Sequence, residues 1–199
     1  MDRFPKCPVP IGTLLPLLLI CVICSIGCVS SPSQSWTQRH AAGLRDRLLQ
    51  LSNTVDRAEA QSIADIAVQR SSALVQQYRL VWPPWVHNNL VNYRLRERGL
   101  CFDWANDLFA ALYGHASSLE LHLAVARMDT PREHNALVIT ARGQPFAQGL
   151  VLDAWRGSGR IWWGDAATDK YPWQLLPPDR IAPELQKLIA TGSGLTPAR

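Results

Sequence analysis

The hydrophobic pattern of this chain changes its period once, and that change restricts the fold more than any other feature of the sequence. Up to Gly114 the apolar residues recur every three or four positions, as in amphipathic helices, whereas from Leu119 onwards they alternate with period 2. Helices followed by a series of strands are typical of an α+β domain with an antiparallel sheet. At 199 residues, one such domain is expected once any targeting segment is set aside.

The elements of this domain can be placed approximately. Proline is tolerated at a first helical position and glycine is a typical helix stop, so Pro84, Gly99 and Gly114 mark helix boundaries. Helices are expected from Trp36 to about Leu51, from a cap at Asn53 or Asp56 to about Leu80, from Pro84 to Gly99, from Cys101 to Gly114, and over 183–190. Strands are expected at 119–128, 134–141, 149–155 and 160–164, separated by turn-rich segments.

The N-terminal segment has the order of a secretory signal. The charged start MDRFPK is followed by an apolar run over 11–27 and then by the Ser-rich stretch SSPSQS. Gly27-Cys28 resembles a lipobox, although Ser25 stands where lipoboxes favour Leu. We therefore expect a lipoprotein signal peptide at 1–27 and a lipid on Cys28 that holds the protein to a membrane.

Two other interpretations of this segment remain. The apolar run approaches the ~20 residues that span a bilayer, so it could be an uncleaved anchor, and ordinary cleavage is the third possibility. All three export the domain. Val29 after the cysteine resembles enteric lipoproteins and favours the periplasmic face of the outer membrane.

Four of the five cysteines belong to the leader or the acylation site, which leaves Cys101 as the single cysteine of the folded domain. A thiol without a disulfide partner in an oxidising compartment is either buried and inert or functional. We expect a tether at 28–36 and a single domain at 37–199. Its parts are an N-terminal helical part at 37–98, a core at 99–165 with a Cys-bearing helix packed on the sheet, and a Pro-rich tail at 166–199.

Cys101, His134 and Asp153 form a candidate nucleophile, base and orienting group. Cys101 is expected at a helix N-terminus, whose free N–H groups favour a thiolate. His134 opens a strand, and Asp153 lies in the apolar segment GLVLDAW, where a carboxylate is costly unless it is hydrogen-bonded. His115 and His122 compete for the role of base, but the first lies at a helix end and the second on the outer face of a strand.

The segments GLCFDWANDL, EHNALVIT and VLDAWR, in this chain order, resemble the papain-like and transglutaminase-like cysteine enzymes. The resemblance implies a helix-borne cysteine packed on an antiparallel sheet. Cys101 would be the nucleophile, His134 the general base and then acid, and Asp153 its orienting partner. Phe102 stands where papain has Trp, and Asp153 is closer to transglutaminases than to the Asn of papain. Asn92 is the preferred oxyanion candidate, with the other nearby amides as alternatives.

The expected activity is that of a cysteine hydrolase or acyl transferase with a thioester intermediate. Its substrates would be peptide, protein or peptidoglycan amides of the cell envelope. The alternative is a non-catalytic lipoprotein that keeps the fold as a binding or assembly module. No cofactor or metal is expected, because the domain contains no CxxC or HxxxH pair. A net charge of +4 without a basic cluster gives no indication of nucleic-acid binding.

Overall fold

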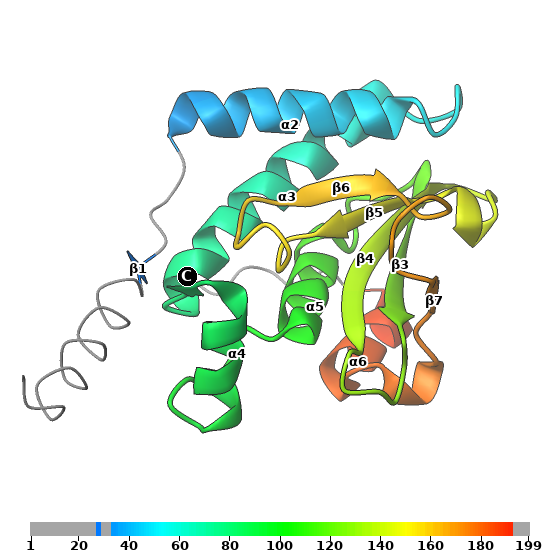
Figure 1. Ribbon diagram of the computed structural model, residues 1–199. Helices are drawn as coiled ribbons and strands as arrows, with labels where there is room; N and C mark the ends of the chain where they lie inside the picture. The colour runs from blue at the N-terminus through cyan, green and yellow to red at the C-terminus, as the bar shows by residue number, and fades with distance from the viewer. Residues whose placement is uncertain (1–26, 29–32, 193–199) are drawn as a thin grey trace, which may run out of the picture.

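The computed structural model describes residues 27–28 and 33–192, and the proposed signal peptide therefore lies almost entirely outside the described residues. Within these ranges the chain is an α+β fold built on a five-stranded antiparallel sheet (Figure 1). Its elements are β1 Gly27–Cys28, α2 Gln34–Leu49, α3 Arg57–Gln77, β2 Val81–Trp82, α4 Pro84–Asn92, α5 Cys101–Leu112, β3 Leu119–Ala126, β4 His134–Ala141, η2 Phe146–Gln148, β5 Leu150–Asp153, β6 Trp162–Asp165, β7 Trp173–Leu175, η3 Pro178–Arg180 and α6 Pro183–Thr191. None of the described helices is long and apolar enough to cross a membrane.

The main sheet has the strand order β6-β5-β4-β3-β7, in which every neighbouring pair is antiparallel. The four strands expected from the alternating pattern form a consecutive meander from β3 to β6. β7 was not expected, because three residues within a Pro-rich tail carry no recognisable alternation. It returns to the opposite edge and pairs with the end of β3, where Ala126 faces Trp173.

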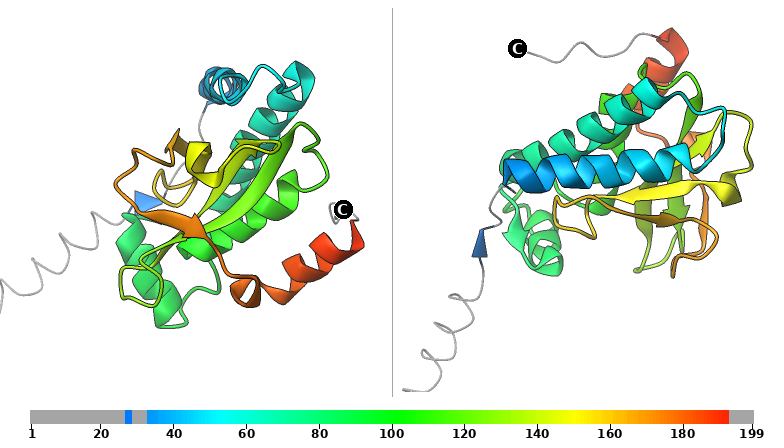
Figure 2. Two further views of the ribbon diagram at one scale, coloured as in Figure 1. Left: turned by 90° about the vertical axis from the view of Figure 1, so that its right-hand side faces the viewer. Right: turned by 90° about the horizontal axis from the view of Figure 1, so that it is seen from above.

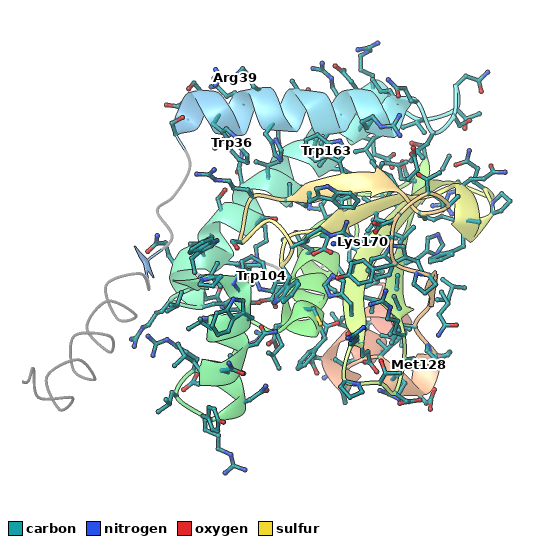
Figure 3. All side chains as sticks on the ribbon, in the orientation of Figure 1. Trp36, Arg39, Trp104, Met128, Trp163 and Lys170 are labelled. Carbon is teal, nitrogen blue, oxygen red and sulfur yellow. The ribbon has the colours of Figure 1, made fainter. Side chains whose placement is uncertain are left out.

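Helices α3 and α5 cover one face of this sheet, and α2 packs along α3 near the β6 edge (Figures 1 and 2). Side chains at alternate positions of the central strands, among them Leu137, Ile139 and Leu152, enter the core beneath the helices. Towards the β6 edge, the ring of His40 on α2 lies 4.1 Å from that of Trp36 and 4.2 Å from that of Trp163 (Figure 3).

The other face of the sheet is covered by aromatic side chains rather than by a helix layer. Ala136, Val138 and Val151 form a small buried cluster there, packed against Trp162 and Trp173. His134 and Asp153 belong to this same face by the two-residue period of their strands. The alternation of side chains along β4 and β5 therefore places His134 and Asp153 on the same face of the sheet, the face that is covered by aromatic rings.

Two helix ends differ from the expectation. The second helix ends at Gln77 and is capped by Asp56, whose carboxylate accepts the N–H of Glu59 at 2.8 Å. The third helix was expected to reach Gly99, which is wrong: α4 ends at Asn92. The reason is local, because Arg94 adopts a left-handed conformation with φ 59°, which cannot continue an α-helix.

Glu59 links α3 to the turn that leads into β3. Its buried carboxylate accepts N–H groups of Ser117, Ser118 and Leu119 at 2.8 to 3.0 Å, and the Ser117 hydroxyl at 2.6 Å. Burial by itself raises the pKa of Glu59. The hydrogen bonds together lower the pKa by more than burial raises it, so the pKa lies below its usual value. The ionised carboxylate thus anchors the start of the sheet to the helical layer.

Glu59→Gln should lower the free energy of unfolding by about 1–3 kcal/mol, because the replacement amide offers one acceptor oxygen to four donors. Since the folded pKa is depressed, the stabilisation by Glu59 is present above pH 4.5, its ordinary pKa, and is lost as the pH falls below it. Urea unfolding at pH 7 and at acid pH measures this. The matched control Glu97→Gln, at an exposed position, should change stability little; an equal loss in both variants would contradict the assignment.

Candidate active site

The start of α5 is built by Asp103, which lies in the first turn of the helix. Its Oδ2 accepts the backbone N–H groups of Gly99 at 2.8 Å and Leu100 at 3.0 Å, and its Oδ1 pairs with Arg98 at 3.2 Å. Cys101 is therefore held in the first position of α5, as expected. The N–H groups of that first turn have no acceptor within the helix, so they present positive dipole ends beside the thiol.

His87, a residue that the sequence did not single out, fixes the approach to Cys101. Its side chain is fully buried, and Nδ1 accepts the N–H of Val81 at 3.3 Å while Nε2 lies 2.9 Å from the carbonyl oxygen of Arg98. The His87 ring packs directly against Gly99, where a Cβ atom would lie 2.2 Å from Nε2. Gly99 also has φ +122°, a backbone conformation that other residues rarely adopt. The histidine thus sets the path of the chain into α5.

His134 and Asp153 come together across β4 and β5. The register pairs Leu137 with Leu152, so Asp153 falls opposite Ala136 and diagonal to His134 on the same face. His134 Nε2 lies 2.6 Å from Asp153 Oδ2, and both side chains are almost completely buried. The expected contact between base and orienting carboxylate is therefore present.

Cys101 approaches the start of β4 from the helical side of the sheet, next to Asn135. The thiol raises the pKa of the His134 imidazole and so lies within its electrostatic reach. Because Nε2 is engaged by Asp153, Nδ1 is the ring nitrogen left for the thiol. Cys101 Sγ also lies 3.7 Å from Oδ1 of Asn135, the residue after the histidine. The thiol itself is only partly buried.

Three aromatic rings enclose His134. The ring centroids of Tyr171, Trp155 and Trp173 lie 4.7, 5.0 and 5.6 Å from that of the imidazole. Trp155 is itself held by a hydrogen bond from Nε1 to Oδ1 of Asn88 at 3.1 Å. These rings exclude water from the His134–Asp153 contact and so strengthen it.

Arg156 is the main site residue that the sequence analysis missed. Its backbone N–H donates to Asp153 Oδ1 at 2.8 Å and its Nε to Oδ2 at 3.1 Å, while its other two nitrogens bind both oxygens of Asp169 at 3.1 and 2.7 Å. Asp169 Oδ2 also accepts a hydrogen bond of 2.8 Å from Trp173 Nε1. The sequence does place Arg156 three residues after Asp153, a spacing that could have indicated their contact. Its other partner, Asp169, lies in a loop thirteen positions further on and could not be inferred from local sequence.

The electrostatics of the group favour a protonated imidazole. Burial lowers the pKa of His134, but the hydrogen bonds with Asp153 and Cys101, and their charges, raise it more, so the pKa lies at about 9 instead of 6.5. Arg156 pairs with Asp153 and with Asp169, so its charge is shared between two carboxylates. His134 is therefore a cation at neutral pH in the folded protein.

A pocket of about 480 Å³ adjoins the thiol on the helical side of β4. Phe102, which follows the cysteine, and Asn135, its hydrogen-bond partner, both line it. Arg180 and Glu184 bring charge to the far wall, and Leu176 adds an apolar surface. Two neighbours of Cys101 thus line the pocket, whereas His134 and Asp153 are almost completely buried.

The remaining candidates lie elsewhere. Asn92, the expected oxyanion donor, is exposed in the last turn of α4, and no hydrogen bond among the described residues joins it to Cys101. His115 follows the C-terminal end of α5, about 20 Å from its start by helix rise. His122 Nε2 lies 2.9 Å from the Thr140 hydroxyl. Neither competing histidine contacts the cysteine.

Comparisons with known proteins add no family to this description. The chain matches no protein-family model and no curated protein, and its fold matches no solved structure. Over 27–28 and 33–192, no group of three or more His, Cys, Asp or Glu side chains is arranged to hold a metal ion. The chemistry of the site must be derived from its own geometry.

The raised pKa of His134 predicts a pH dependence of stability. A group with a raised folded pKa stabilises the protein fully below its unfolded pKa of 6.5, and this contribution is lost as the pH rises through about 9. The difference in unfolding free energy between the wild type and His134→Gln should therefore shrink from pH 6.5 to above 9. Urea titrations across this range test it, with His122→Gln as the control that should show no such narrowing.

Proposed function

We propose that the protein is a cysteine hydrolase or an acyl or amide transferase that works through a thioester on Cys101. The observation that carries the proposal is that His134 binds Asp153 through Nε2 while Cys101, at the start of α5, contacts the adjacent residue Asn135. A nucleophile, a base and an orienting acid in this order are the parts that covalent acyl transfer needs. The papain-like or transglutaminase-like kinship is part of the same proposal.

In the proposed cycle, protonated His134 stabilises the Cys101 thiolate, which attacks the carbonyl carbon of an amide or ester. The backbone N–H of Cys101, free at the start of α5, is available to the oxyanion. His134 then gives its proton to the leaving amine or alcohol as the C–N or C–O bond breaks, and the thioester remains. Neutral His134 next removes a proton from water or an amine, whose attack releases the acyl group and restores the thiolate.

Asp153 keeps the imidazole in the orientation that this cycle requires. Its carboxylate accepts from Nε2–H and so directs Nδ1 to the sulfur. Arg156 anchors the carboxylate in turn through two hydrogen bonds, one from its backbone N–H and one from its Nε. An exported location would make peptide, protein or peptidoglycan amides the substrates at hand.

We also propose that the chain is exported and lipidated on Cys28. The support is the order of charged, apolar and small residues at its N-terminus. Cys28 lies in β1, which pairs with β2 of the domain. The lipid would then emerge directly beside the folded part, and a membrane would be the immediate neighbour of the domain.

Iodoacetamide should alkylate Cys101 of the native full-length protein at about pH 6.5, because the thiolate is the reactive form and an ordinary thiol has a pKa of about 8.5. His134→Gln should slow this reaction by roughly an order of magnitude, because the neutral amide removes the cation that favours the thiolate. Mass spectrometry of the Cys101 peptide separates it from the four leader cysteines.

His122→Gln is the matched control, since this half-buried histidine does not contact the cysteine and should leave the rate unchanged. A thiol that resists iodoacetamide until the protein unfolds would contradict the enzyme and support the alternative, a non-catalytic binding or assembly module. With a substrate in hand, Asp153→Asn should retain the fold and lose most of the turnover, because the amide favours the wrong tautomer of His134.

Cys28→Ser should release the protein from membranes or leave an unprocessed precursor, because acylation needs the thiol. Fractionation of cells followed by immunoblotting measures both results. Cys24→Ser, four residues earlier in the apolar run, is the control that should be processed and anchored normally. A Cys28→Ser protein of mature size that stays membrane-bound would exclude the lipobox.

A further inference from the structure

The exposed aromatic residues of the domain gather around α4. Among the described residues, Trp82, Trp85, Tyr93 and Leu95 are the four most exposed large hydrophobic side chains, at 55, 65, 77 and 63 %. Trp85 lies in the first turn of α4 and Tyr93 is its C-cap residue, and both are exposed, whereas His87 on the inner side is fully buried. An outward face of this composition is unusual for a surface that meets only water.

Arginine side chains surround these residues. A hollow of about 390 Å³ beside α4 is lined by Arg79, Arg94, Arg96 and Arg98 together with Leu95, and Glu97 is its one acidic residue. Arg98 is neutralised by Asp103 and Asp107. Arg79 and Arg94 are exposed and have no ion-pair partner within the described part of the chain. We call Trp82, Trp85, Tyr93, Leu95, Arg79 and Arg94 together the α4 surface.

The α4 surface lies where the N-terminal segment meets the domain. β1 pairs with β2 so that Cys28, the residue that would carry the lipid, faces Val81, next to Trp82, at the usual strand separation of ~4.8 Å. In all three views α4 projects from the body of the molecule at the end where β1 lies (Figures 1 and 2). Whatever holds residue 28 to a membrane therefore brings the α4 surface close to it.

We propose that the α4 surface rests on an anionic lipid bilayer and orients the domain there. Trp and Tyr favour the interface between headgroups and acyl chains, because their rings are apolar with one polar edge. Guanidinium groups next to them bind lipid phosphates and are attracted by the negative surface potential. The inference rests on the proposed membrane attachment of the N-terminus and is independent of the chemistry of Cys101.

The test uses the full-length protein reconstituted into vesicles of phosphatidylethanolamine and phosphatidylglycerol with brominated acyl chains, which quench tryptophan fluorescence on contact. The wild type should be quenched, and the double variant Trp82→Phe, Trp85→Phe should lose most of that quenching. Trp163→Phe is the matched control, because this ring is packed beneath α2 and should not contribute. Circular dichroism verifies that each variant is folded.

Charge provides a second arm of the same experiment. Arg79→Ser with Arg94→Ser should lower the quenching in phosphatidylglycerol vesicles, and wild-type quenching should fall when phosphatidylcholine replaces phosphatidylglycerol. Arg39→Ser with Arg132→Ser removes two exposed arginines elsewhere and should have no effect; Arg39 points outward from α2 in Figure 3. Equal quenching in the wild type and the Trp82, Trp85 double variant would overturn the proposal, as would protection of the α4 surface by a second copy of the chain in the absence of vesicles. Either failure would leave the alkylation of Cys101 unaffected.

Discussion

The hydrogen bond between His134 and Asp153 places a carboxylate and an imidazole in a nearly dry environment, and much of the surrounding structure serves to keep both groups paired. A buried carboxylate without partners is expensive, and here Asp153 has three donors: the imidazole, the N–H of Arg156 and its guanidinium. Arg156 could not be buried there alone either, so Asp169 neutralises its other side. The chain of alternating charges ends at Trp173 and at the backbone of the Asp169 loop.

This chain of charges explains why β7 belongs to the fold. β7 pairs only with β3, at the edge of the sheet, yet its first residue, Trp173, packs against His134 and donates to Asp169. Tyr171 just before it covers the imidazole from another side. The Pro-rich tail thus closes the outer face of the site. Its short strand is held both by pairing with β3 and by the aromatic and polar contacts of Trp173.

The helical side of the site is held by different means. Asp103 fixes the start of α5 through backbone N–H groups, and His87 with Gly99 fixes the segment before it. These contacts fix the start of α5, where Cys101 lies beside the first residues of β4. The cysteine and its histidine therefore belong to two separately stabilised layers that meet at one point. The thiol is only partly buried, whereas the imidazole is enclosed.

Much of this architecture was determined by local pattern in the sequence. The apolar periods predicted the order of helices and strands, the single domain cysteine at a helix start and the strand positions of His134 and Asp153, because burial and backbone propensity act over a few residues. Other features came only from the tertiary structure. The register of β4 on β5, the enclosure by Tyr171 and Trp173, the Arg156–Asp169 pair and the role of His87 all depend on residues distant in sequence, and such contacts are decided by the packing of the whole core. Local pattern thus identified the candidate groups, and long-range packing decided which of them meet.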